Sequence, residues 1–360
     1  MSINPRIIVN LDKLSHNLQA IREILQPRNI DFAVVTKVFC ADKRIVSMLR
    51  ESGVDFFADS RLANLQAIGE GPRRLLLRVA MLSEAERVVA NSELSLQSEI
   101  SVIRALGEAA DRLKRRHGVV LMVDMGDLRE GIFYRDRESI LRTARAALDY
   151  EYLSLEGVGV NLTCYGAIVP DEHNLGGLVD IARWLRQELG VPLPLVSGGN
   201  SSSLGLISRG EAPEGITNLR LGEVLALGND TAACCLMPGF CGDAFTLCAE
   251  LVEVQRKPSK PIGVSGANAF GESVRYEDRG WQRRGILAIG RQDIHAETLH
   301  PLDERVEILG ASSDHLLVNL TQAPEYEVGA EIRFNLDYGN LLHAFTSAYV
   351  AREYVGKEEG

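Results

Sequence analysis

The stretch Phe32-Ala33-Val34-Val35-Thr36-Lys37-Val38-Phe39-Cys40 places a lysine at the end of an apolar run. The apolar residues predict a buried strand, and the chain after it alternates further strands with helices. In a barrel built from such alternation, the carboxyl ends of the strands form the face that carries the active site. Apolar neighbours disfavour the ammonium form of a lysine, so Lys37 suits the role of a nucleophilic amine.

A lysine in this position also has a purely structural explanation. Its stem can pack on the rim of the barrel while its charged head reaches water. Taken alone, Lys37 favours that explanation, and the residues elsewhere in the chain reverse the balance.

Composition excludes several classes of protein. The 360 residues are 46% apolar and 24% charged, as in an ordinary globular protein, and the net charge of -10 argues against a general nucleic-acid binder. No apolar window reaches the length of a membrane span, and the first residues lack a signal-peptide pattern. The six cysteines have no CxxC spacing, and the stretch from Cys234 to Cys248 is interpreted as small buried residues rather than zinc ligands. We therefore expect a cytoplasmic protein with reduced thiols, no metal site and no nucleic-acid or membrane partner.

Apolar segments before residue 225 predict eight strands separated by helices. Strands buried on both faces and linked by helices indicate an α/β fold with a parallel sheet, and eight units favour closure into a (β/α)8 barrel of the TIM type. An open doubly wound sheet is the alternative, but no GxGxxG follows the first strand. The predicted strands are 32–37, 54–58, 75–79, 94–96, 119–123, 155–160, 193–196 and 217–221.

Beyond residue 240 the helical periodicity fades. Short apolar segments lie between Gly, Pro and Asp turns, which predicts a β-rich C-terminal domain. We place the barrel at residues 1–230, with the first few residues able to join the β domain, and the β-rich domain at 231–360. The predicted strands of this domain are 252–254, 285–289, 306–309, 316–320 and 332–334.

Unusual polar residues follow the predicted barrel strands at one end. Barrels that bind phosphate often do so in the loops after strands seven and eight, and the run SGGNSSS (197–203) suits that task because glycines expose backbone N–H groups and serines add donors. A flexible Gly/Ser turn is the alternative.

A lysine for an aldehyde and an anion site for a phosphate together indicate pyridoxal 5'-phosphate, PLP. The candidate cofactor-binding residues are Lys37, Arg129, Asn161, Asn200, Ser201, Arg220, Gly222 and Glu223.

Arg220 bears on the type of reaction. An arginine facing the pyridine nitrogen of PLP would donate to it and oppose its protonation, since arginine stays ionised at any working pH. That weakens the electron sink and favours exchange of one proton at Cα over decarboxylation.

Eight motifs span almost the whole chain. They are VTKVFCAD (35–42), ADSRLANL (58–65), MVDMGDLREGI (122–132), GVNLTCYGAIVPD (159–171), SGGNSSSLGLI (197–207), NLRLGE (218–223), IGRQD (289–293) and GASSDHL (310–316). In the same order, they resemble those of the alanine racemase family of fold-type III PLP enzymes, and most closely its ornithine/lysine racemase-like branch.

The resemblance implies that Lys37 is the Schiff-base lysine and that Arg129 lies near the cofactor phenolic oxygen and the substrate carboxylate. It also implies that Arg220 faces the pyridine nitrogen, that Ser201, Gly222 and Glu223 hold the phosphate, and that a homodimer shares its active sites.

One position departs from that family. Alanine racemases carry a catalytic tyrosine in a Gly-Tyr-x-Asp stretch, and the corresponding stretch here has Arg291 in its place. The second acid/base is therefore open, and its candidates are Asp293, Asp314, His315, Tyr165 and Cys164.

The leading functional prediction is a PLP-dependent amino-acid racemase, an isomerase acting on ornithine, lysine or alanine. A related PLP decarboxylase would place an acidic residue at the pyridine nitrogen, where Arg220 is expected. An aldolase-like lyase needs metal ligands in the second domain, for which Asp314-His315 is the available suggestion. A non-catalytic PLP-carrying protein would resemble the barrel alone.

Overall fold

The chain folds into two compact units. The computed structural model describes residues 4–267, 270–271, 273 and 276–356. One unit is Lys13–Gly242, and the other joins the described residues up to Asp12 to those from Asp243 onward. The boundary between the units falls after Gly242, beyond residue 230, because Asn17 of α1 (Leu11–Leu25) holds the segment that precedes the boundary on the barrel. The Nδ2 of Asn17 donates to the carbonyls of Leu225 and Cys241 at 3.0 and 2.9 Å.

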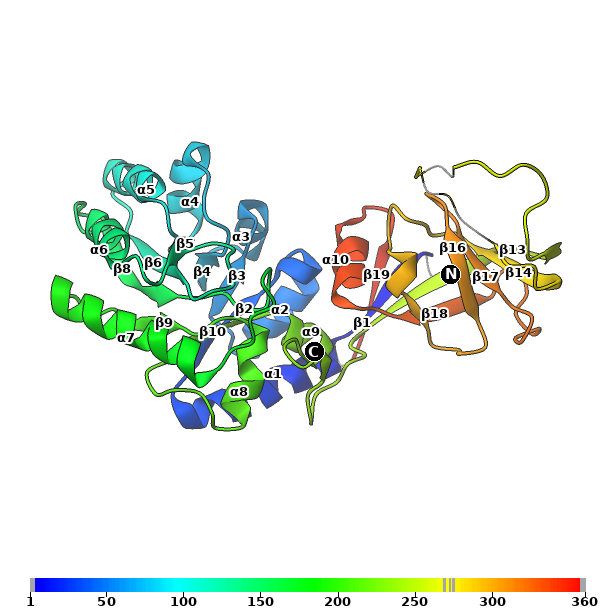
Figure 1. Cartoon of the computed structure of the whole chain (residues 1–360), viewed down its shortest axis with the longest axis horizontal. Coiled ribbons are helices and arrows are strands. Elements are labelled where there is room, and N and C mark those ends of the chain that lie inside the picture. Colours follow the sequence, from blue (N-terminus) through cyan, green and yellow to red (C-terminus); the bar gives the residue numbers. More distant parts are fainter. Residues whose placement is uncertain (1–3, 268–269, 272, 274–275, 357–360) are drawn as a thin grey trace. The chain divides into compact units, whose positions relative to one another are not determined.

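The first unit contains a closed barrel of eight parallel strands (Figure 1). The order is β5-β4-β3-β2-β10-β9-β8-β6, and pairing of β5 with β6 closes the ring. The predicted (β/α)8 barrel is thus confirmed. The strands are β2 (Asp31–Val35), β3 (Phe56–Asp59), β4 (Arg73–Leu76), β5 (Leu94–Gln97), β6 (His117–Asp124), β8 (Leu153–Gly159), β9 (Leu195–Ser197) and β10 (Asn218–Leu221).

Helices surround the strands (Figure 1), and the longer helices bury one apolar face. In α1, residues at three- and four-residue spacing such as Leu14, Leu18 and Ile21 are buried, and Pro27 follows the helix. The five-residue helices α8 and α9 were not expected, because they are too short to show a period. The helices are α1 (Leu11–Leu25), α2 (Lys43–Glu51), α3 (Leu62–Ile68), α4 (Ala85–Asn91), α5 (Ile100–Leu113), α6 (Arg137–Ala146), α7 (Glu172–Leu189), α8 (Leu204–Ser208) and α9 (Glu223–Leu227), with short 3-10 helices η1 (Gln26–Arg28), η2 (Lys37–Phe39), η3 (Leu82–Glu84) and η4 (Ser201–Ser203).

Three very short strands complete the barrel unit. β7 (Ile132–Phe133) pairs with the end of β6, and β11 (Asn229–Asp230) pairs with β12 (Cys235–Leu236) in a hairpin. The inside of the barrel is filled by apolar side chains from successive strands, among them Ala33, Phe56, Leu75 and Met122. The barrel is therefore a packed core, and polar chemistry is left to the strand ends.

The second unit is β-rich, as predicted. Its sheet has the order β15-β18-β13-β14-β17-β16, and β1 pairs with both β13 and β19. The sequence did not predict α10, whose first turn is capped by Asp337 through the backbone N–H of Asn340. The elements are β1 (Arg6–Asn10), β13 (Phe245–Pro258), β14 (Trp281–Leu287), η5 (Ala296–Thr298), β15 (His300–Pro301), β16 (Glu307–Ala311), β17 (Leu316–Asn319), β18 (Glu331–Asn335), α10 (Tyr338–Thr346) and β19 (Ala351–Val355).

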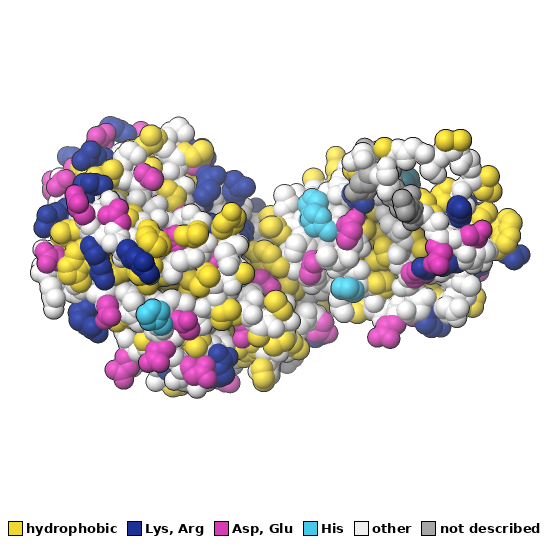
Figure 2. Space-filling model, viewed as in Figure 1, with side chains coloured by type: hydrophobic (Ala, Val, Ile, Leu, Met, Phe, Trp, Pro, Cys, Tyr) yellow, Lys and Arg dark blue, Asp and Glu magenta, His cyan; other side chains and the backbone are white. Residues whose placement is uncertain are grey.

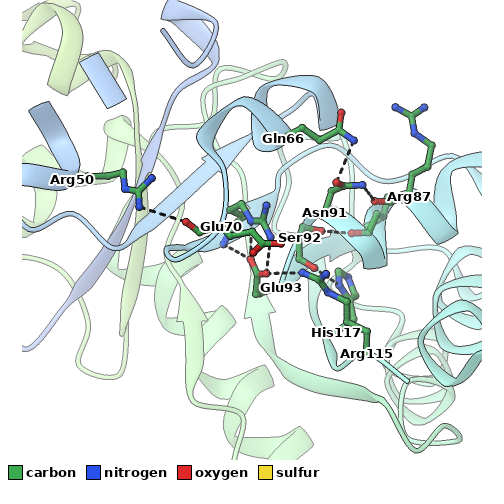
Figure 3. Close-up of polar contacts among 11 residues, drawn as sticks. Arg50, Gln66, Glu70, Arg87, Asn91, Ser92, Glu93, Arg115 and His117 are labelled. Carbon is green, nitrogen blue, oxygen red and sulfur yellow. Dashed lines mark hydrogen bonds and ion pairs between the residues drawn. The ribbon is translucent and has the colours of Figure 1, made fainter. Parts of the chain in front are cut away.

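The amino ends of strands β4 to β6 hold a network of charged residues (Figure 3). Glu93 accepts hydrogen bonds from the buried Arg74 at 2.9 Å and from Arg115 at 3.1 Å. Nearby, His117 is fully buried between the hydroxyl of Ser95 at 2.8 Å and the carbonyl of Ser92 at 3.1 Å. Burial lowers the pKa of His117 to about 4, so it is neutral at physiological pH.

The surface of the barrel unit carries both signs of charge. Figure 2 shows Lys and Arg side chains interspersed with Asp and Glu on its visible face. Among the described residues, no helix combines the length and apolar character needed to cross a membrane.

Candidate active site

Lys37 lies just beyond the carboxyl end of β2, where it opens the short helix η2. The strand ends at Val35, because the carbonyl of Thr36 turns back to accept from the N–H groups of Phe39 and Ala41, both at 3.2 Å. Residues Cys40 and Ala41 then adopt positive φ angles of 50° and 49°. This tight turn holds Lys37 on the face formed by the strand ends.

Arg129 is presented by a loop whose shape its neighbours impose. The carboxylate of Asp124, at the end of β6, accepts from the N–H groups of Gly126 at 2.8 Å and Leu128 at 3.1 Å. At Gly131 φ is +118°, and a Cβ there would lie 2.6 Å from the backbone nitrogen of Asp124, so a larger residue does not fit. The spacing of DMGDLREG thus defines the position of Arg129.

A chain of hydrogen bonds joins Arg129 to Arg220 across the strand ends. Arg129 donates through Nε and Nη2 to both carboxylate oxygens of Glu130, the latter at 2.7 Å. The Nδ2 of Asn161 donates to the same carboxylate, and its Oδ1 accepts from Nη2 of Arg220 at 2.7 Å. Arg220 also donates to the carbonyl of Val160 at 2.6 Å and to the hydroxyl of Ser197.

The charges in this chain have perturbed pKa values. Arg220 is completely buried, and that burial lowers its pKa to about 10, opposed by the charge of Glu130. It remains ionised at neutral pH. Burial acts to raise the pKa of Glu130, but the hydrogen bonds and charge of Arg129 outweigh it, so the pKa lies below its usual value. For Arg129, the bond to Glu130 likewise outweighs burial and raises the pKa.

The loop after β9 is tied to its neighbours on both sides. Asn200 donates through Nδ2 to the carbonyl of Leu162 at 3.1 Å, and its Oδ1 accepts from the N–H of Ser202 at 2.9 Å. On the other side, the Ser201 hydroxyl accepts from the N–H of Val224 at 3.2 Å, next to the candidates Gly222 and Glu223. The Gly/Ser run is therefore an ordered turn bonded to the loops after β8 and β10.

Two positions favour glycine: Gly199 in the turn after β9 and Gly222 at the end of β10. At Gly199 φ is +110°, and a Cβ at Gly222 would lie 3.0 Å from the Cβ of Val35. The left-handed backbone at Gly199 favours glycine, and the backbone at Gly222 comes closer to the end of β2 than a larger residue permits.

The eight cofactor-binding candidates all lie at the carboxyl ends of the barrel strands, whereas the three second-unit candidates lie elsewhere in the chain. Asp293 is only 3% exposed and accepts from the hydroxyl of Ser347 at 2.6 Å. Asp314 is exposed and accepts from Nε2 of Gln292 at 2.6 Å, and the neighbouring His315 is also exposed.

Within the second unit, the stretches around Arg291 and Asp314 lie side by side. The N–H of Arg291 donates to the carbonyl of Ser312 at 2.8 Å, and a Cβ at Gly290 would lie 2.2 Å from the carbonyl oxygen of Ser313. Arg291, in the position of the expected tyrosine, pairs with Glu297 at 2.9 Å and lies over the ring of Phe270.

Sequence reasoning did not assign the roles of two carboxylates of this site. Glu130 stands beside Arg129 in the quoted motif, but the sequence does not show that its side chain joins two arginines. Asp59 ends the second barrel strand, β3, and its complete burial beside the Lys37 turn required the tertiary structure. Their shared signal is an acidic residue at or shortly after the end of a barrel strand. Across the described ranges, no three His, Cys, Asp or Glu side chains gather into a potential metal site.

Comparison with known proteins identifies the class. Residues 9–229 match the family described as alanine racemase, N-terminal domain. The chain is 45% identical over 351 residues to an ornithine racemase from Acetoanaerobium sticklandii, covering 97% of this chain and 99% of that protein. It is 35% identical over 356 residues to a lysine racemase from Thermotoga maritima, covering 98% and 99%.

A solved structure supports the fold. The alanine racemase from Bartonella henselae, which contains covalently bound pyridoxal phosphate, superposes with a TM-score of 0.74 at 15% identity, covering 98% of this chain and all of the other. The family match and the two relatives show that the chain belongs to the alanine racemase family, whose members bind PLP. Its activity is that of an amino-acid racemase, which confirms the leading functional prediction.

Proposed function

We propose that this racemase holds PLP covalently on Lys37 and acts on a basic amino acid, ornithine or lysine. The observation that carries the proposal is the meeting of Lys37, the Arg129–Arg220 chain and the ordered Gly/Ser turn at one end of a closed barrel. The basic substrate is suggested by the two relatives, which share 45% and 35% identity with nearly the whole chain.

The residues present fit the phosphate and the ring of the cofactor. Ser201 supplies a hydroxyl, and Gly222 leaves its backbone open to close approach beside Val35. Arg220 is buried, and its acceptors are a hydroxyl, a backbone carbonyl and an amide oxygen, all neutral. A buried cation with neutral acceptors suits a position facing an electron-rich pyridine nitrogen.

The side chains have distinct tasks in this reaction. When bound, PLP withdraws electrons from the substrate and makes its Cα proton acidic. Lys37 holds and returns the proton at Nζ on one face of Cα, and Arg129 binds the substrate carboxylate through its planar guanidinium. Arg220 keeps positive charge beside the ring nitrogen, which restrains the reaction to a single proton exchange.

Racemisation also needs a proton carrier on the opposite face of Cα. Asp293, Asp314, His315, Tyr165 and Cys164 remain the candidates. The burial of Asp293 and its bond to Ser347 make it less accessible than Asp314 and His315.

The cofactor assignment is tested by trapping. We expect borohydride reduction of the PLP-loaded protein to leave an adduct that peptide mapping finds on Lys37. The Lys37→Ala variant should lose both adduct and activity, whereas Lys43→Ala, which changes an exposed lysine on α2, should keep both. An adduct on another lysine contradicts the proposal.

The substrate assignment is tested with a panel of L-amino acids in D2O, following deuterium at Cα by NMR. Ornithine or lysine should exchange fastest and yield the D-amino acid. Fastest exchange with alanine would contradict a basic substrate, and cleavage of the carbon chain would indicate a lyase.

We further propose a homodimer in which the second unit of one subunit completes the site of the other. Supporting this are exposed apolar side chains on the loops at the strand ends: Leu128 is 64% exposed and Tyr165 75%. Closed two-fold assemblies are also the commonest kind.

Subunit complementation tests the dimer. Inactive Lys37→Ala protein is mixed with protein inactivated at Asp314, and activity should return, since one site of a mixed dimer has both groups intact. If mass photometry verifies that mixed dimers have formed and activity still does not return, the proposal of shared sites is contradicted.

A further inference from the structure

A buried carboxylate lies directly beneath the turn that carries Lys37. Asp59 ends strand β3 and has no exposed surface. Its carboxylate accepts from the Thr36 hydroxyl at 2.6 Å, the N–H of Arg61 at 2.8 Å and Nδ2 of Asn64, which lies 3.1 Å from each oxygen. All three donors are neutral groups.

Such a group is costly to bury. Removing an ionised carboxylate from water is unfavourable unless hydrogen bonds or an opposite charge compensate it. Burial raises the pKa of Asp59, while the three hydrogen bonds and the charge of Lys37 act in the opposite direction. The hydrogen bonds that compensate the burial of Asp59 include the one from Thr36, the residue directly before Lys37.

The bond from Thr36 connects this carboxylate to the turn. Thr36 is fully buried, its N–H donates to the carbonyl of Ala58 at 2.9 Å, and its own carbonyl closes the turn that follows. Cys40 and Ala41 are both in the left-handed region, which costs roughly 1–2 kcal/mol for each such residue. A conformation of this kind persists only where its surroundings determine it, and the Asp59–Thr36 bond is one of those constraints.

We propose that Asp59 is a positioning residue for Lys37: its bond to Thr36 orients the turn from which the amine projects. This inference rests on the proposed role of Lys37. Proton exchange at Cα requires an amine held at a fixed position on one face of the substrate, and the turn to which Asp59 is bonded sets that position.

The test measures how fast Lys37 of the apoprotein captures PLP, by borohydride trapping at timed intervals and peptide mass spectrometry. Asp59→Ala, which removes the acceptor of the Thr36 hydroxyl, should slow capture roughly tenfold or more. Asp55→Ala, which changes an exposed carboxylate just before β3, is the matched control and should capture PLP at the wild-type rate. Capture at the wild-type rate in Asp59→Ala overturns the positioning role.

Thr36→Val removes the same bond from the donor side and keeps the carboxylate. Capture of PLP by Lys37 should slow roughly tenfold or more in Thr36→Val, whereas Thr36→Ser, which keeps the hydroxyl, should capture at the wild-type rate. Wild-type capture in Thr36→Val, or slow capture in Thr36→Ser, overturns the positioning role, and this arm decides alone if Asp59→Ala does not fold. The site of the adduct tests the proposed function separately: a PLP adduct on another lysine refutes that function whatever the rate of capture.

Discussion

The two ends of the barrel treat buried charge in different ways. At the amino end, where Figure 3 shows Glu93 beside Arg115 and His117, the buried Arg74 donates directly to Glu93. Burial keeps His117 neutral at physiological pH. At the carboxyl end, Arg220 is buried among neutral acceptors and reaches Glu130 only through Asn161. The opposite charges of a directly bonded pair such as Arg74 and Glu93 largely cancel each other's electric field. A charge such as that of Arg220, whose counter-ion is one residue further away, leaves an electric field that can act on a ligand. We therefore expect the charged residues at the amino end to contribute to stability and those at the carboxyl end to contribute to the reaction. Each variant below can contradict this division.

The largest effect is expected for Arg220→Gln. Loss of a preorganised charge from the site should reduce kcat by roughly two to three orders of magnitude, measured by polarimetry of the racemisation. Arg209→Gln, an exposed arginine paired with Glu211, is the control and should keep the wild-type rate. A rate within threefold of wild type in Arg220→Gln would remove this residue from the chemistry.

His117 should make the barrel acid-sensitive without affecting the reaction. Its pKa in the fold is about 4 against an ordinary 6.5, so the unfolded chain binds the proton first. Stability is therefore full above pH 6.5 and falls toward pH 4, by on the order of 3 kcal/mol from this residue. In calorimetric Tm measurements His117→Asn should lose less stability over this range, and His173→Asn, an exposed residue on α7, should follow the wild type. Parallel curves for His117→Asn and wild type contradict the assignment.

Glu93→Gln tests the direct pair at the amino end. It leaves Arg74 buried without its carboxylate, and we expect a loss of about 2 kcal/mol in unfolding free energy, reduced from the fully buried case because Glu93 is half-buried. Glu86→Gln breaks the exposed pair with Arg112 and should cost less than about 0.5 kcal/mol. A lower kcat in folded Glu93→Gln protein would break the division between the two ends.

The smallest effect is expected for Glu130→Gln. The amide keeps the shape and can still accept from Asn161, but it loses the charge that pairs with Arg129. We expect roughly a tenfold loss in kcat/KM, the scale of a charge-assisted hydrogen bond. Glu138→Gln, exposed on α6, is the control. A variant as active as wild type would mean that Arg129 and Arg220 work independently of the carboxylate between them.

Local pattern alone was sufficient to predict the architecture and much of the candidate site. Eight apolar strands with helices between them predict the barrel, since the carboxyl ends of parallel strands share one face. That geometry groups Lys37, Arg129, Asn161 and Arg220 before any contact is known.

Contacts between strand ends far apart in the chain were decided by the tertiary structure. The link from Asn161 to Arg220 spans 59 positions and the bond from Thr36 to Asp59 spans 23, so no local period encodes either. The burial of Asp59 and the bridging role of Glu130 depend on which neighbours surround them after closure of the barrel. Periodicity reports which face of an element is apolar, whereas the partner of a polar atom is set by three-dimensional proximity.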